Sequence, residues 1–194
     1  MFRNYFPQQL DEYYPADIGK LCHLTEDTAT PQQVRQMELH ILELLNLELY
    51  GVDPMTFVHR FLKAAFKSKN FGVYELSILF MDAMVQKLEL WNESCSKKAA
   101  ICVLASLLVF DKESKSLDEI WTPNLKYYAW DDAKSLLPTS IFMLNTLIRV
   151  LKDATSTREF SISIKYSSVS RHRGFLSTLS VSQVRRAIER AETF

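Results

Sequence analysis

The sequence predicts an all-α fold. Glycine occurs at 4 positions and proline at 6, while 47% of the residues are hydrophobic, a balance that favours helices joined by few tight turns. Capping side chains directly before a proline mark three helix starts, at Thr30, Asp53 and Thr122. With 194 residues, the chain is long enough to bury a substantial core, in one domain or in two small ones.

The best-defined helix near the N-terminus spans residues 30–47 and follows a shorter one at 15–24. Thr30 and Gln33 form a Thr-x-x-Gln capping box, and Pro31 occupies the first helical position. Apolar side chains recur along this helix at helical spacing and form a single arc. The arc contains Val34, Met37, Ile41, Leu42, Leu44, Leu45 and Leu49.

One acid, Glu38, lies in the middle of this apolar arc. A carboxylate that packs against apolar side chains loses hydration, so it needs a cation or several hydrogen-bond donors. These can come from the same chain, as an intramolecular ion pair, or from a partner protein. The helix is therefore a candidate interface, and the intramolecular pair is the alternative explanation.

A boundary between two subdomains is expected after this helix. Gly51 can close the helix, and Asp53 and Pro54 can cap and begin the next one, so we expect a hinge here. Amphipathic helices are predicted beyond the hinge, over residues 54–67 and 73–91.

The longest apolar run, residues 99–110, predicts a buried helix at the centre of the second subdomain. It is well short of the ~20 residues that a membrane span needs, and it is apolar on most sides, so neighbouring helices should surround it. Ser94 or Ser96 can cap it. The net charge of zero gives no general attraction to an anionic membrane or to nucleic acid.

The segments after the central helix alternate between loops and helices. A charged loop is expected at residues 111–119 and a short helix at 123–130. A longer helix should run to about residue 152, with a kink at Pro138 because proline removes a backbone hydrogen bond.

The C-terminal region contains one ambiguous segment, FSISIKY at residues 160–166. It alternates like a strand, but a lone strand has no pairing partner in a helical chain, so a loop or a helix extension is expected. Ser182 should cap a last helix over residues 183–192.

No catalytic or cofactor motif occurs. The glycines are too few for a phosphate-binding loop, the four histidines lie in separate segments without an HExxH pair, and no GxSxG sequence is present. We therefore expect a protein that is not an enzyme and that uses no metal and no cofactor. Three cysteines without metal or redox spacing, and the lack of a signal-peptide pattern, suit a reducing intracellular compartment.

Several segments, taken in order along residues 11–179, match motifs of one known family. They are Glu12–Pro15, Leu24–Thr28, Arg35–Glu38, Phe61–Ala65, Trp121–Pro123, Leu136–Pro138 and Lys165–Ser167. Together they resemble cyclins of the mitotic type, nearest to the A-type and B-type groups. The resemblance implies a cyclin fold, which is a pair of five-helix bundles called cyclin boxes.

Compared with that pattern, the chain would hold the C-terminal part of the first box at residues 1–50, a complete second box at 51–167, and a basic tail with a helix at 168–194. The first three helices of the first box would be missing, together with a lysine that usually accompanies the interface glutamate. Lys20 or Arg35 are the candidates to replace that lysine. Aromatic residues within the first fourteen positions are candidates to cover the apolar arc.

The resemblance also implies a function. Family members are non-catalytic regulatory subunits that bind and activate a cyclin-dependent protein kinase in cell-cycle control. By direct match, Glu38 is the family's interface glutamate, and Leu42, Leu47 and Leu49 are its apolar companions. The expected partner is such a kinase, in the nucleus or the cytoplasm, and no membrane or nucleic-acid partner is expected.

Two alternatives remain open. One is a cyclin-fold adaptor that binds protein or nucleic acid without activating a kinase, for which the basic tail is the only support. The other is a truncated cyclin that activates nothing.

Overall fold

The structure, a computed structural model, describes residues 17–67, 69–111, 116–152, 160–167 and 174–194. Within these ranges the chain forms α-helices and short 3-10 turns and no strand, which confirms the all-α prediction for the described residues. It divides into two compact units, Met1–Gly51 and Val52–Phe194, called unit 1 and unit 2 below.

Unit 1 contains α1 (Ile18–Leu24) and α2 (Pro31–Leu44). The predicted capping box of α2 is present, because the Gln33 amide donates to Thr30 Oγ1 at 3.3 Å and the Thr30 amide donates to Gln33 Oε1 at 2.8 Å. The helix ends at Leu44 rather than at residue 47. Asn46 and Leu47 adopt left-handed φ angles of 49° and 61°, through which a right-handed helix cannot continue.

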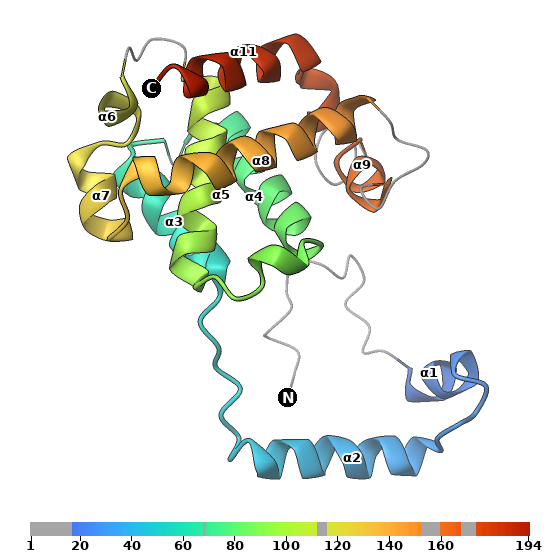
Figure 1. Cartoon of the computed structure of the whole chain (residues 1–194). Coiled ribbons are helices and arrows are strands. Elements are labelled where there is room, and N and C mark those ends of the chain that lie inside the picture. The colour runs from blue at the N-terminus through green and yellow to red at the C-terminus, as the bar shows by residue number, and fades with distance from the viewer. Residues whose placement is uncertain (1–16, 68, 112–115, 153–159, 168–173) are drawn as a thin grey trace. The chain divides into compact units, whose positions relative to one another are not determined.

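Unit 2 is larger and almost entirely helical where it is described. Its elements in chain order are α3 (Pro54–Ala64), α4 (Phe71–Val85), η2 (Leu88–Leu90), α5 (Cys95–Phe110), α6 (Leu117–Ile120), α7 (Pro123–Ala129), α8 (Ala133–Lys152), α9 (Phe160–Ser167), η3 (Phe175–Thr178) and α11 (Val181–Glu192). Figure 1 shows α5 in the middle of unit 2, with α8 crossing it and α11 near its C-terminal end.

The central position of α5 follows from its composition. Every residue from Ala99 to Val109 is buried, as expected for a helix that is apolar on all sides. The cap is Ser94, which accepts a hydrogen bond from the Lys97 amide at 3.2 Å. The Ser106 hydroxyl is buried but hydrogen-bonded. It accepts from the Ser77 hydroxyl of α4 at 3.0 Å and donates to the Cys102 carbonyl oxygen at 2.8 Å.

The end of α4 differs from the prediction. The apolar pattern favours a helix up to residue 91, but α4 ends at Val85 and is followed by the 3-10 turn η2. The indole N–H of Trp91 donates to the Val85 carbonyl oxygen at 2.9 Å and so satisfies a group left free by the helix end. A side-chain contact therefore fixes this terminus.

The segment FSISIKY is helical, as α9. Ile162 and Tyr166 are four positions apart and both buried, which is the spacing of one helix face. The prediction that this segment is not a strand is therefore confirmed, and it forms a separate helix rather than a loop. The predicted loop at 111–119 also contains the start of a short helix, α6, which Ser116 caps by accepting from the Glu119 amide at 3.3 Å.

Candidate functional site

The predicted interface residues lie in unit 1, on and just after α2. Glu38 and Leu42 are one helical turn apart and share a face; Glu38 is exposed and Leu42 is half-buried. Leu47 and Leu49 follow the end of α2, so helical spacing does not set their directions, and Leu47 is 70% exposed. The structure thus brings two of the four residues together on one helix face.

The apolar arc around Glu38 is open to solvent. None of the residues of α2 is buried, and Met37 and Leu44 are 58% and 69% exposed. The proposed aromatic cover, residues 1–14, lies outside the described residues. Large apolar side chains gathered on one exposed helix are typical of an interaction surface.

Glu38 makes no hydrogen bond and no ion pair with any residue that the structure describes. Neither Lys20 nor Arg35 pairs with it, so the intramolecular ion pair is absent from this part of the chain. A free carboxylate among apolar neighbours can accept charge-assisted hydrogen bonds from a partner's lysine or arginine. Burial of the surrounding side chains would exclude water and strengthen such a pair.

A second polar cluster, missed by the sequence reasoning, joins α4 to α9 in unit 2. Asp82 Oδ2 accepts hydrogen bonds from Lys165 Nζ at 2.6 Å and from the Tyr166 hydroxyl at 2.7 Å. Tyr166 is fully buried, whereas Asp82 and Lys165 are partly exposed. Both donors bind the same carboxylate oxygen, and the cluster ties α4 to α9.

Two buried groups near this cluster resist ionisation. Burial raises the pKa of the Cys102 thiol, and the negative charge of Asp82 adds to that effect. Burial also raises the pKa of the Tyr166 phenol, as do the charge of Asp82 and the hydrogen bond to it. Both groups therefore stay protonated in the folded protein at pH values that ionise them in the unfolded chain.

The stability of unit 2 should consequently fall at alkaline pH. These two groups do not change the stability of unit 2 at pH values below their pKa in the unfolded chain, which is about 8.5 for cysteine and about 10 for tyrosine. Above each value it should fall by about 1.4 kcal/mol per pH unit per group, because the unfolded state binds fewer protons than the folded state. Urea unfolding followed by tryptophan fluorescence measures this directly, since Trp91, Trp121 and Trp130 all lie in unit 2.

Two variants separate the contributions of the two groups. Cys102→Ala should flatten the decline between about pH 8.5 and pH 10, and Tyr166→Phe should reduce the slope only above about pH 10. An equally steep decline in both variants would assign the alkaline instability to other groups.

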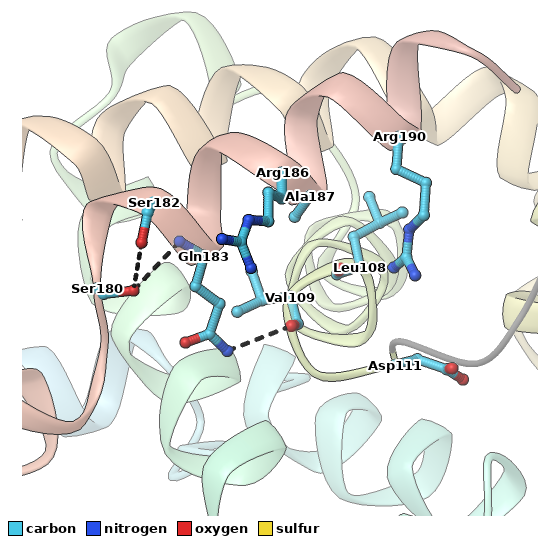
Figure 2. A pocket seen from close by; sticks show the side chains of 9 residues that line it. All are labelled: Leu108, Val109, Asp111, Ser180, Ser182, Gln183, Arg186, Ala187 and Arg190. Carbon is cyan, nitrogen blue, oxygen red and sulfur yellow. Dashed lines mark hydrogen bonds between the residues drawn. The ribbon is translucent and has the colours of Figure 1, made fainter.

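Near the C-terminus, α11 covers the end of α5. Figure 2 shows Gln183 reaching the Val109 carbonyl oxygen, to which Gln183 Nε2 donates at 3.4 Å. Arg190 Nη2 donates to the Leu108 carbonyl oxygen at 2.7 Å. These side chains satisfy carbonyls that the last turn of a helix leaves free, and the arginine complements the negative end of the helix dipole.

The predicted basic tail is therefore part of unit 2. Val184, Ala187 and Ala191, which recur at helical spacing, are buried. The helix begins at Val181 with Ser180 as its cap, two positions before the predicted Ser182 cap, and the Gln183 amide donates to Ser180 Oγ at 3.2 Å.

A pocket of about 400 Å³ lies between α11 and the end of α5 (Figure 2). Arg186 and Arg190 line it together with the acid Asp111, and Arg190 bonds to the carbonyl end of α5. The negative groups already present oppose an anionic ligand. Capping of α5 accounts for the Gln183 Nε2 and Arg190 Nη2 donors here, whereas the buried Arg190 Nε has no hydrogen-bond partner among the described residues.

The described residues offer no metal site, since no group of three or more His, Cys, Asp or Glu side chains gathers among them. In the same ranges, no helix combines the length and the hydropathy required to cross a membrane. Cys22, Cys95 and Cys102 are free thiols.

Comparison with known proteins gives one family match and several relatives. The family described as "Cyclin, C-terminal domain" matches residues 52–182. The chain is 28% identical over 160 residues to the G2/mitotic-specific cyclin-B of Drosophila melanogaster, covering 80% of this chain and 29% of that protein. It is 26% identical over 158 residues to the G2/mitotic-specific cyclin-B1 of Xenopus laevis, covering 81% of this chain and 37% of that protein.

A third relative, the G2/mitotic-specific cyclin-A of Spisula solidissima, is 33% identical over 98 residues, which cover 48% of this chain and 22% of that protein. The chain therefore spans well under half the length of the curated relatives that it matches.

Proposed function

The chain belongs to the cyclin family, and from that membership we propose that it is a non-catalytic regulatory subunit of a cyclin-dependent protein kinase in cell-cycle control. The mitotic names of its relatives support the cell-cycle role. We also propose that residues 1–50 are part of a first cyclin box and that the second box begins at residue 51. The family match continues to residue 182, beyond the expected end at 167, and α11 packs on α5 and α8, so we propose that the C-terminal helix belongs with the second box.

The proposed kinase-binding role is best supported by the solvent-exposed apolar face of α2. An unpaired carboxylate, Glu38, stands there beside exposed apolar side chains. We propose that this face binds the mobile helix of the kinase, with Leu42, Leu47 and Leu49 as apolar contacts. Holding that helix inward would complete the lysine–glutamate ion pair that a protein kinase needs for phosphoryl transfer.

A kinase activation assay tests the proposal. The full chain is added to each of several purified cyclin-dependent kinases, and both complex formation and phosphorylation of a peptide substrate with ATP are measured. Binding together with a rise in phosphorylation of at least tenfold is expected. Binding without a rise would support the adaptor function instead, and no binding to any of the kinases would contradict the proposal.

A further inference from the structure

We propose that a groove between α3 and α7 of unit 2 binds an acidic, extended segment of a partner protein. The groove has a volume of about 390 Å³. Its lining residues are Arg60, Lys63, Ala64, Phe66, Asn124 and Tyr128, none of which is acidic. Its residues belong to unit 2 and are not those of the α2 face, and the proposal can be tested without a kinase.

The first support is an uncompensated positive charge. Residues 54–74 contain two cations of the groove and two further lysines but no aspartate or glutamate, in a chain whose net charge is zero. Arg60 and Lys63 form no ion pair with any described residue. The dipole of α3 stabilises the positive charge of Lys63, which lies in its last turn, but its effect does not reach back to Arg60. Helix electrostatics therefore explain the presence of only one of the two cations. The pair is therefore placed to attract carboxylates.

The second support is the geometry of Arg60. Its guanidinium carbon lies 4.7 Å from the ring centroid of Tyr128, which is a cation–π stacking distance. Stacking uses the flat face of the guanidinium and leaves the N–H groups at its edge available. Those groups match the two oxygens of a carboxylate in a bidentate hydrogen bond.

The third support is Phe66, whose side chain is 85% exposed. Its φ of 55° is left-handed, and it occupies the position after the C-cap of α3 where glycine is favoured. Two backbone amides after the helix donate hydrogen bonds back to its last turn. The Phe66 amide donates to the Lys63 carbonyl at 3.0 Å, and the Lys67 amide donates to the Leu62 carbonyl at 2.9 Å. An exposed phenyl ring at such a position gives the fold no evident benefit, whereas it offers a ligand an apolar contact beside two cations.

A protein segment fits these features better than a nucleic acid. The groove is a single short recess with one arginine already stacked, whereas single-stranded nucleic acid is held by a charged track with successive stacking rings. We expect one apolar side chain to pack against Phe66, with acidic residues on either side of it that reach Arg60 and Lys63.

Fluorescence anisotropy with the full chain tests this proposal without a kinase. The probe is a labelled synthetic peptide with one central leucine between two pairs of glutamates, and the control peptide carries glutamines instead. The glutamate peptide should bind at least tenfold more tightly. The double variant Arg60→Glu/Lys63→Glu should bind the glutamate peptide at least tenfold more weakly. The control Arg185→Glu/Arg186→Glu makes the same charge change on α11 and should weaken this binding less than twofold.

Phe66→Gly provides a variant that should fold at least as well as the natural chain, because glycine is favoured at this φ. This variant should bind the glutamate peptide at least threefold more weakly, while the midpoint of its thermal unfolding does not fall. Equal binding of both peptides, or equal losses in the two double variants, would overturn the proposal. So would tighter binding of a thymidine oligonucleotide that depends on Arg60 and Lys63. The proposed kinase regulation would stand in either case, since the assay contains no kinase.

Discussion

Deletion of residues 180–194 should abolish the cooperative unfolding of unit 2. The deletion removes the buried side chains of Val184, Ala187 and Ala191 and uncovers the apolar surfaces of α5 and α8 on which α11 packs. It also removes the donors to the Leu108 and Val109 carbonyls at the end of the central helix. We expect a loss of at least about 5 kcal/mol, comparable with the whole stability of a small domain.

The measurement is urea unfolding followed by tryptophan fluorescence, which reports unit 2 because all three tryptophans lie there. Arg190→Met is the graded control, since it keeps most of the apolar stem and removes the guanidinium, with its bond to the Leu108 carbonyl and its unpaired Nε. In that variant the free energy of unfolding should fall by about 1–3 kcal/mol, and the unfolding of unit 2 should remain cooperative. A truncated protein with an unchanged urea midpoint would show that the segment is an independent tail.

The helix starts could be predicted because their determinants are local. Thr30, Asp53 and Thr122 each stand directly before a proline and cap a helix, and the cap and the proline are adjacent in sequence. The start at Ser180 carried a usable signal as well, because Ser180 and Gln183 have the spacing of a capping box. The structure shows that this serine, not Ser182, caps α11.

Features that depend on distant residues could not be predicted. The end of α4 is set by the indole of Trp91 folding back onto Val85, while the apolar pattern continues past it. The tie between Asp82 and Tyr166 joins positions 84 residues apart, and no local spacing indicates it. Periodicity likewise placed Glu38 on an apolar face of α2 but gave no information on what covers that face.

Glu38→Ala should weaken binding to the partner kinase by roughly 2–4 kcal/mol, the range of an interface hot spot, which corresponds to about 30-fold to 1000-fold in Kd. The proposed complex surrounds the carboxylate with apolar contacts, so its removal leaves the kinase cation buried and unpaired. Titration of kinase with wild-type and variant chains, by calorimetry or anisotropy, gives the ratio of the two Kd values.

Glu43→Ala is the matched control on the same helix. Glu43 is exposed and lies about 140° around the helix axis from Glu38, so its removal should change the Kd by less than twofold. Alanine is the best helix former, so neither substitution should unfold α2, and a loss confined to Glu38→Ala would come from the interface. If Glu38→Ala binds normally while Leu42→Asp does not, the apolar face contacts the kinase and the carboxylate is not its anchor. If both bind normally, the kinase contact lies outside this face of α2.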